Sequence, residues 1–383
     1  MCLSSGIGET IISSNTPKKT LGAGHGIIDV HSHALLPLWL DAASKVLNIS
    51  RDNLQIAGTP VPDWSVDIHL AMMDAHGIAA CVLSWPPATS FLKGKPARDL
   101  ARAMNEAFAE IVARHPTRFG AFAVLPLDDM DASIEEMSYA LDVLKLDGVS
   151  SSTHVAGAYL GDSRFDTWFA EMNRRRATLF VHPIPSLNAD KVSMGINVAI
   201  LEFMFDSTRM ATNMVLSGAK KRFADVRLIC THGGGTIPYV ASRISILEPL
   251  FGAGPNRPTL SAEEVLAGLS TFYFDLTAST APASLDAIRR LVPPSQLMLG
   301  FDFPMMPAST VTGAWKKFED HDYRTGDRYD IVQGTALTLL PGGPGRAIEV
   351  ALTESPASCH RFRQIDNIVC RESDDYLYSA GCK

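Results

Sequence analysis

Residues 26–39 read GIIDVHSHALLPLW, an apolar segment that leads into two histidines separated by one residue. Side chains on a strand alternate between its two faces, so His31 and His33 are expected to project to the same side. Two interpretations fit such a pair. It is either a polar strand end that meets solvent, or part of a metal site, because imidazole is a common metal ligand. Two histidines alone do not distinguish these interpretations.

The segment after this first strand belongs to a regular alternation that runs through most of the chain. Short apolar or β-branched runs predict strands at 27–32, 78–84, 118–125, 147–151, 178–182, 226–231, 271–276 and 296–301. Amphipathic patterns between them predict helices at 65–76, 97–114, 131–145, 163–175, 200–218, 236–248 and 281–291, with a last one near 329–339. Eight strand-then-helix units indicate an α/β protein with a parallel sheet closed into a TIM (β/α)8 barrel.

The regions outside this alternation set the expected domain organisation. We predict an N-terminal arm at 1–24, one barrel domain at 25–345 and a C-terminal tail at 346–383. Residues 34–63 and 183–199 are too long for plain connections, which predicts excursions over the mouth of the barrel.

Composition narrows the class of protein. The 383 residues are 46% hydrophobic and 20% charged, which is typical of a globular chain with a large core. A net charge of −7 and the lack of a basic block argue against nucleic acid or membrane partners. The six cysteines form no CxxC pair, and no secretory signal is evident. We therefore expect a cytoplasmic protein with reduced cysteines, although three of them lie in the C-terminal tail, where an oxidising setting would allow cross-links.

Polar residues follow several of the predicted strands at the point where each strand ends. In a TIM barrel these ends converge on one mouth, where the catalytic groups lie. The residues are His31, His33, His182, His232, Asp275 and Asp302. Taken singly, His182 and His232 fit ordinary core histidines. Taken together, several imidazoles and a carboxylate predict a site for Zn²⁺, Mn²⁺ or Fe²⁺.

The other histidines carry less weight in this argument. His69, His76 and His115 are expected at solvated helix positions. His154 follows the fourth predicted strand and is expected in an exposed loop, with a place facing the pocket as the alternative. Asp29 either orients a ligand or simply ends a loop, and the sequence leaves both open.

With these motifs in place, the chain resembles a known family. The His31-x-His33 strand end, His182-Pro183, "THGGGTIPYVASRI" and "GFDFP" resemble the amidohydrolase superfamily, across residues 26–341. They are most similar to its branch of metal-dependent, non-oxidative decarboxylases. Within that branch, sequence segments such as "RFGAFAVLPL" and "LDGVSSST" most resemble the 6-methylsalicylate decarboxylases.

The resemblance implies roles for individual residues. It implies a metal site formed by His31, His33, His182 and Asp302, and a catalytic histidine at His232. Arg243 corresponds to an arginine that contacts substrate in relatives, sometimes across a dimer interface; a surface ion pair is the alternative. Relatives are homodimers or higher homo-oligomers, which is the expected state here.

The sequence also departs from the family pattern in places. Phe301 stands where relatives have serine, and Thr335-Ala336 where they have Asn-Ala. These departures leave the predicted metal ligands unchanged. No lysine follows the fourth predicted strand, where binuclear members carry the carboxylated lysine that bridges two ions. One divalent ion is therefore expected, Zn²⁺ first and Mn²⁺ second.

The expected activity is the decarboxylation of a small ortho-hydroxy aromatic acid similar to 6-methylsalicylate. Asp302 would exchange a proton with the ring carbon, and His232 would assist. Trp85 and Trp39 are the candidates to flank the ring; core packing is the alternative for both, and it is the favoured one for Trp39. The alternative activity is hydrolysis of a lactone or amide by the same metal shell. A third possibility, a non-catalytic metal-binding protein, does not account for His and Asp beyond the ligand set.

Overall fold

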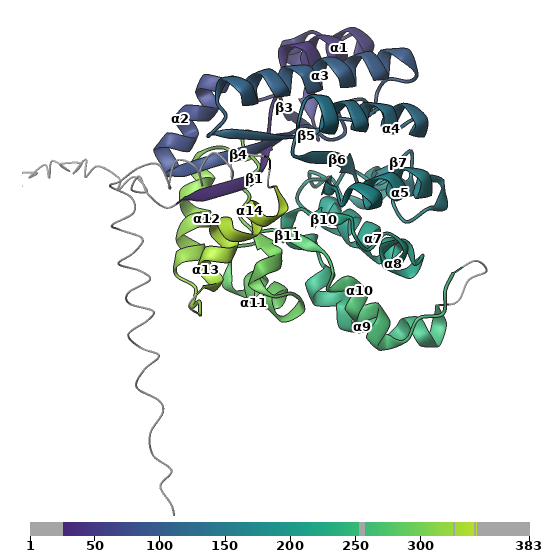
Figure 1. Cartoon of the computed structure of the whole chain (residues 1–383). Helices are drawn as coiled ribbons and strands as arrows, with labels where there is room; N and C mark the ends of the chain where they lie inside the picture. Colours follow the sequence, from purple (N-terminus) through teal and green to yellow (C-terminus); the bar gives the residue numbers. More distant parts are fainter. Residues whose placement is uncertain (1–25, 253–256, 325, 341, 343–383) are drawn as a thin grey trace, which may run out of the picture.

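The computed structural model describes residues 26–252, 257–324, 326–340 and 342 (Figure 1). The predicted arm at 1–24 and tail at 346–383 lie outside these residues, and so do His25 and the cysteines of the tail. The proposed domain boundaries therefore stay predictions. None of the helices in the described part of the chain is long and apolar enough to cross a membrane.

The centre of the molecule is an eight-stranded parallel sheet in the order β1-β4-β5-β6-β9-β10-β11-β12 (Figure 1). The strands are β1 (Ile27–His33), β4 (Ile78–Ser84), β5 (Phe119–Ala123), β6 (Gly148–Ser152), β9 (Thr178–His182), β10 (Arg227–Cys230), β11 (Tyr273–Asp275) and β12 (Leu297–Met298). Residues 299–303 pair with β1 through the bridges Asp29↔Leu299 and Ser32↔Phe303. These bridges close the sheet, so the predicted TIM barrel is confirmed.

Helices surround this barrel, as the alternation predicted (Figure 1). The longer ones are α1 (Pro37–Leu47), α2 (Val66–His76), α3 (Lys95–Arg114), α4 (Met130–Ser138), α5 (Asp166–Arg175), α7 (Glu202–Leu216), α9 (Ile237–Phe251), α10 (Ala262–Leu269), α11 (Pro282–Leu291) and α12 (Ser309–Glu319). Side chains fix several starts: Ser65 accepts from Ile68 N, and Ser261 with Glu264 forms a capping box. Helices α1, α10 and α12 lie outside the predicted ranges.

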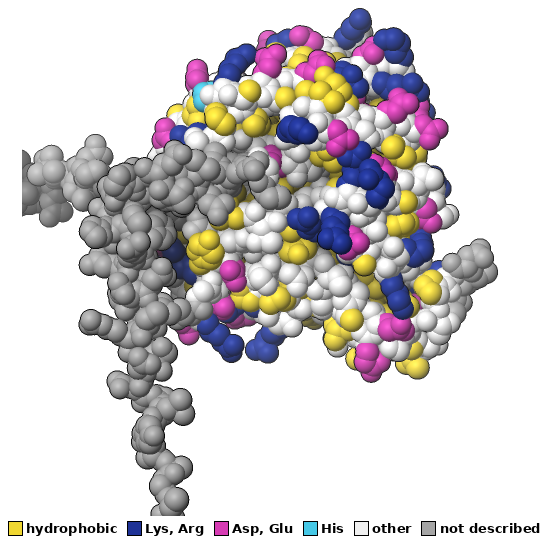
Figure 2. Space-filling model, viewed as in Figure 1, with side chains coloured by type: hydrophobic (Ala, Val, Ile, Leu, Met, Phe, Trp, Pro, Cys, Tyr) yellow, Lys and Arg dark blue, Asp and Glu magenta, His cyan; other side chains and the backbone are white. Residues whose placement is uncertain are grey.

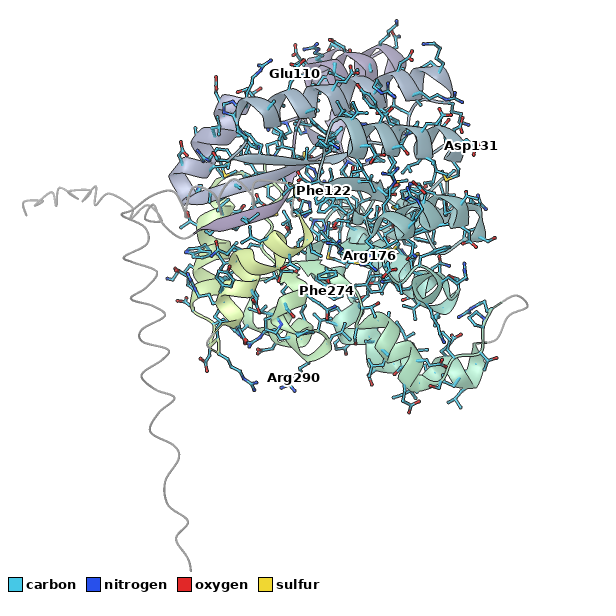
Figure 3. The ribbon with its side chains drawn as sticks, in the orientation of Figure 1. Glu110, Phe122, Asp131, Arg176, Phe274 and Arg290 are labelled. Carbon is cyan, nitrogen blue, oxygen red and sulfur yellow. The ribbon has the colours of Figure 1, made fainter. Side chains whose placement is uncertain are left out.

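Two apolar layers hold the barrel together. The inner layer fills the barrel with Ile28, Val30, Val82, Phe122, Phe180, Ile229 and Met298. Phe122, labelled in Figure 3, stacks on Phe180 with ring centroids 5.1 Å apart. The outer layer joins the strands to the helices through larger side chains such as Phe108, Trp168 and Phe274. This arrangement matches the continuous apolar runs of the strands, because both of their faces are buried.

One end of the barrel is closed by the chain itself. Helix α14 (Thr335–Leu339) adds Ala336 and Leu339 to the inner layer, and the Leu339 carbonyl accepts a hydrogen bond from Thr178 Oγ1 at 2.9 Å. Thr178 is the first residue of β9, so α14 covers the N-terminal ends of the strands. The carboxyl ends, where TIM barrels carry their sites, lie at the opposite end.

The two predicted excursions contact each other. Residues 34–63 form α1, a 3-10 turn and the hairpin β2 (Gln55–Ile56) and β3 (Thr59–Pro60), and residues 183–199 contain the short α6 (Ala189–Val192). Asn197 Nδ2 donates to the Ala57 carbonyl at the hairpin tip, at 2.9 Å. The surface around the barrel mixes hydrophobic side chains with charges of both signs on the face seen in Figure 2.

Two histidine predictions are wrong. His69 was expected at a solvated position, yet it is buried, accepts from Trp64 Nε1 at 3.0 Å and packs against Phe119 and Phe303. Burial lowers the pKa of His69 to about 3, so this imidazole is neutral. His154 was expected in an exposed loop, yet it is buried too. Helix and loop patterns do not show which face the rest of the fold covers.

Candidate metal centre

The strand-end residues do meet at one end of the barrel. His31 and His33 lie at the end of β1, His182 at the end of β9 and Asp275 at the end of β11. His232 begins the turn after β10, and Asp302 follows β12 where the chain pairs again with β1. All six side chains are buried. The convergence that the sequence predicted is therefore present.

Four of these residues form a compact group of possible ligand atoms. One atom from each of His31, His182, His232 and Asp302 lies within 4.8 Å of the others. His33 belongs to the same cluster through Asp302, because its Nε2 lies 2.9 Å from Asp302 Oδ1. The other two distances to this carboxylate are longer, 3.5 Å from His31 Nε2 and 3.7 Å from His232 Nε2. We call these five residues the strand-end cluster.

The backbone around this cluster is tightly constrained. His232 has φ +55° and Asp302 has φ +58°, in the left-handed region that non-glycine residues rarely adopt. Such conformations are typical of functional sites, where the surrounding structure imposes them. Gly300 lets the chain after β12 approach β1, because a Cβ there would lie 2.7 Å from His31 Cβ. The loop that carries Asp302 is thus held against the two β1 histidines.

The ring nitrogens of three histidines are already oriented by the protein. His31 Nδ1 donates to Asp275 Oδ2 at 3.0 Å, and His182 Nδ1 donates to the Pro183 carbonyl at 2.7 Å. His33 Nδ1 lies 3.2 Å from Ser84 Oγ and 3.4 Å from the Ser84 carbonyl. A proton on Nδ1 leaves the Nε2 lone pair free, and this is how metal-binding histidines are usually held.

His232 differs from the other three histidines. Its Nδ1 is buried and has no hydrogen-bond partner among the described residues, whereas its Nε2 faces Asp302 Oδ2. A ring with no anchor on Nδ1 is not fixed in one tautomer, which suits a group that gains and loses a proton. Distance alone groups His232 with His31 and His182, but this anchoring pattern separates it from them.

The donor set fits a divalent cation. His31 Nε2 and Asp302 Oδ1 are buried and lack conventional hydrogen-bond partners among the described residues, which is costly unless another group satisfies them. Burial lowers the pKa of His31 and lowers that of His182 well below its usual value, so both imidazoles are neutral, as metal ligands must be. Burial opposes ionisation of Asp302, but the surrounding imidazoles outweigh it and hold its pKa well below the usual value.

Two further carboxylates, outside the strand-end cluster, accept hydrogen bonds from its residues and hold them in position. Asp275 binds His31 Nδ1 and also accepts from the backbone N of His232 at 3.1 Å. Asp29 accepts from Ser32 Oγ at 2.6 Å and from the backbone N of His31 and Phe301, at 2.9 and 3.1 Å. Asp29 therefore does not end a loop; it connects the end of β1 to the segment that follows β12. Its burial raises its pKa to about 7.

Asp275→Asn is expected to weaken metal binding without removing a ligand. The amide cannot accept the His31 proton as strongly, so the His31 ring becomes less basic and less well oriented. Loss of such a partner typically costs about 10- to 100-fold in metal affinity. Competition with a chromophoric chelator measures this change. An affinity equal to that of the wild-type protein would contradict the positioning role of Asp275.

The remaining predicted residues have different surroundings. Trp85 follows β4, is buried, and makes an edge contact with His33 at a centroid distance of 5.4 Å. Trp39 packs on Trp85 and donates to the Ala88 carbonyl, which fits a packing role. Phe203, which the sequence did not single out, contacts the His182 ring at 5.7 Å. Arg243 lies on the exposed side of α9 and makes no hydrogen bond or ion pair within the described chain.

The sequence matches one family model over most of its length. The model is described as Amidohydrolase, and it matches residues 28–342. This chain is an amidohydrolase-family protein. The matched region includes every residue of the strand-end cluster and all eight strands except Ile27, the first residue of β1.

Curated relatives of this amidohydrolase are named as decarboxylases. It is 32% identical to decarboxylase yanB of Aspergillus niger, over 82% of this chain and 87% of that protein. It is 30% identical to decarboxylase macB of Penicillium terrestre, over 82% of this chain and 94% of that protein. It is 28% identical to 6-methylsalicylic acid decarboxylase of Penicillium expansum, over 82% and 96%. These similarities confirm the predicted family branch.

Solved structures share the fold of this amidohydrolase. The 5-carboxyvanillate decarboxylase LigW of Sphingomonas paucimobilis has a TM-score of 0.72 at 21% identity, over 83% of this chain and 99% of that one. A dihydroxybenzoic acid decarboxylase of a Polaromonas species has a TM-score of 0.69 at 20% identity, over 82% and 97%. That crystal contains manganese and the inhibitor 2-nitroresorcinol.

Proposed function

We propose that this protein is a metal-dependent, non-oxidative decarboxylase of a small ortho-hydroxy aromatic acid, similar to 6-methylsalicylate. The observation that carries the proposal is the strand-end cluster itself. Three Nδ1-anchored imidazoles and one carboxylate are buried together at the strand ends, and a fourth, unanchored imidazole faces that carboxylate. The named decarboxylases among the relatives support the same activity.

We assign His31, His33, His182 and Asp302 as the residues that hold one divalent ion. Three nitrogens and one oxygen favour Zn²⁺, and Mn²⁺ is the alternative that a structural neighbour contains. A single ion is supported by the end of β6, where Ser150–Ser152 take the place of a bridging lysine. The nearest lysine before that strand, Lys145, is exposed.

The reaction replaces the carboxylate on a ring carbon with a proton. A divalent ion held by His31, His33, His182 and Asp302 would supply Lewis acidity, which would favour ionisation of the ortho hydroxyl. Asp302, ionised at rest, accepts the hydroxyl proton and delivers it to the ring carbon. The electrons of the breaking carbon–carbon bond return to the ring, and CO₂ leaves. The phenolate that remains takes up a proton from solvent and leaves as the phenol. His232 Nε2, 3.7 Å from Asp302 Oδ2, is placed to exchange the proton with Asp302.

Trp85 and Phe203 are the aromatic side chains that we assign to the flat substrate. Each contacts a proposed ligand by a ring edge, Trp85 at His33 and Phe203 at His182. Trp85 Nε1 is buried and has no hydrogen-bond partner among the described residues. A substrate oxygen would satisfy this donor and fix the orientation of the ring.

Activity is tested by loading the metal-free protein with Zn²⁺ or Mn²⁺ and supplying salicylate and 6-methylsalicylate. We expect CO₂ and the corresponding phenol in equal amounts, and a loss of at least about 100-fold after treatment with a chelator. Lactones and amides serve as controls. Hydrolysis of these compounds without release of CO₂ from any acid would replace the proposed activity with the alternative one.

We further propose that the protein forms a homodimer through α9. On this helix Tyr239, Ile246 and Leu250 are 88%, 57% and 67% exposed and follow the i, i+7, i+11 spacing of one helix face. Exposed Arg243 lies in the same stripe at i+4. Helix α9 runs along the outer edge of the molecule in Figure 1. A second copy would cover this stripe and give Arg243 a partner across the interface.

The double variant Ile246→Asp/Leu250→Asp is expected to be monomeric, because two charges cannot be buried in a symmetric apolar contact. Analytical ultracentrifugation measures the change, and thermal unfolding checks that the barrel is intact. Asp320→Asn, at the exposed end of α12, is the control for altered charge. A wild-type protein that sediments as a monomer would rule out this interface.

The cytoplasmic location is also part of this proposal. Both cysteines of the described chain, Cys81 and Cys230, are free and buried. Burial raises the pKa of each thiol, so neither is reactive.

A further inference from the structure

A cavity of about 170 Å³ lies beside the strand-end cluster, between the ends of β4, β5 and β6. Three of its wall residues place it next to the proposed ligands. Trp85 contacts His33, Ser152 pairs with His182 in the sheet register, and Ile184 follows His182 by two residues. A molecule held at the strand-end cluster would therefore have this cavity on its β4–β6 side.

The wall of the cavity is largely apolar. Trp85, Ala88, Val124, Leu125 and Ile184 contribute hydrophobic surface. Four hydroxyl groups of the wall already donate to main-chain carbonyls: Ser150 to Ala123, Ser151 to Ser152, Ser152 to His154 and Thr89 to Leu125. The fifth, that of Ser90, is on an exposed residue. The buried donor of the wall that has no partner among the described residues is Trp85 Nε1, which we have assigned to a substrate oxygen.

The charged and titratable groups at the cavity do not make its inner wall polar. His154 is buried with both ring nitrogens engaged, Nδ1 by the backbone N of Gly157 and Nε2 by the Pro185 carbonyl. Lys93 and Asp128 line the cavity but are exposed, so they lie at its outer rim. The inner part of the cavity therefore suits an uncharged, apolar group.

The volume exceeds what a methyl group needs. Apolar cavities of about 150 Å³ in proteins hold a molecule of benzene, which has six carbons. A cavity of about 170 Å³ therefore has room for a substituent of roughly five or six carbons. A single methyl would leave most of this apolar space unfilled.

We propose that the substrate carries an apolar substituent of about three to six carbons, at the ring position that bears the methyl group in 6-methylsalicylate, and that this cavity binds it. This inference rests on the proposed decarboxylase function. The inference adds to that function the size and the apolar character of the ring substituent, which make the preferred acid different from 6-methylsalicylate.

The first test is a series of 6-substituted salicylates with hydrogen, methyl, propyl, pentyl and undecyl groups. Burial of each methylene contributes about a fourfold gain, so kcat/KM is expected to rise on the order of 100-fold from methyl to pentyl. The undecyl acid is expected to gain nothing beyond pentyl, because the cavity is full. Equal kcat/KM for methyl and pentyl acids would overturn the inference.

Variants that fill the cavity make the test specific. Ser151→Leu and Ala88→Leu both add side-chain volume to the wall, and either alone suffices if the other fails to fold. Each is expected to lower the pentyl-to-methyl ratio of kcat/KM at least tenfold. Lys93→Ala, at the exposed rim, is the matched control and should leave this ratio unchanged. A ratio that all three variants leave unchanged would contradict the assignment.

Binding of the product separates this inference from the proposed function. Isothermal titration with 3-methylphenol and 3-pentylphenol needs no turnover. Tighter binding of the pentyl compound in the wild-type protein, lost in Ala88→Leu, supports the cavity even if no acid is decarboxylated. If the protein decarboxylates these acids but shows no preference for chain length in rate or in binding, the proposed function is supported and the role of the cavity is contradicted.

Discussion

The His232→Ala enzyme is expected to keep its metal ion and to lose about 10²- to 10⁴-fold in kcat, the usual contribution of a positioned acid–base group. The physical reason is the unanchored Nδ1 of His232, which sets this ring apart from the three histidines whose Nδ1 atoms are held. Metal content by atomic absorption and single-turnover CO₂ release measure the two quantities separately.

Two further variants sharpen this experiment. His232→Asn keeps a residue that tolerates the left-handed backbone at φ +55°, so it separates loss of the imidazole from strain on the main chain. His33→Ala is the contrasting case, and it is expected to bind the ion at least about 100-fold more weakly. If His232→Ala loses the ion and His33→Ala retains it, the ligand set is His31, His182, His232 and Asp302 instead.

Asp302→Asn is expected to abolish decarboxylation, with a loss of at least about 10³-fold in kcat/KM. The change removes a charged oxygen beside three imidazoles and also removes the group that carries the proton. Asparagine tolerates the left-handed backbone at φ +58°, so the loop should keep its course.

The assay for Asp302→Asn needs saturating metal, so that weak binding and lost proton transfer are distinguished. With the ion restored, turnover should stay undetectable. Asp320→Asn, on the exposed end of α12, is the control for loss of one carboxylate and should match the wild-type rate. Recovery of turnover in metal-loaded Asp302→Asn would show that another group protonates the ring carbon.

The fold was predictable because its strands are buried on both faces. Apolar runs such as 78–84 and 178–182 coincide with β4 and β9 residue for residue. The convergence of His31, His182 and Asp302 followed from the barrel alone, since all parallel strands end at the same mouth. The weakest boundaries were those of β12, which was predicted at 296–301 and is limited to Leu297–Met298. The residues after it pair with β1 only through isolated bridges.

Other features depend on contacts between residues far apart in the sequence, which the pattern of hydrophobic residues does not predict. The anchoring of His31 by Asp275 joins residues far apart in the chain, so the sequence could place both at the mouth but not their bond. The burial of His69 depends on Trp64, Phe119 and Phe303, which come from three separate segments. The cavity beside Trp85 arises from three strand ends together, and only their arrangement defines its size.

The barrel closes where its first and last strands meet, and this junction also carries His31, His33 and Asp302. Asp302 N donates to the His31 carbonyl at 2.7 Å, and His33 N donates to the Phe303 carbonyl at 2.7 Å. An ion held there would connect the first strand of the barrel to the segment after the last one. Binding of the ion and unfolding of the whole barrel would therefore be thermodynamically linked. The melting temperature should then rise with the logarithm of free metal concentration, and stripped protein should lose protection from hydrogen exchange first along this junction.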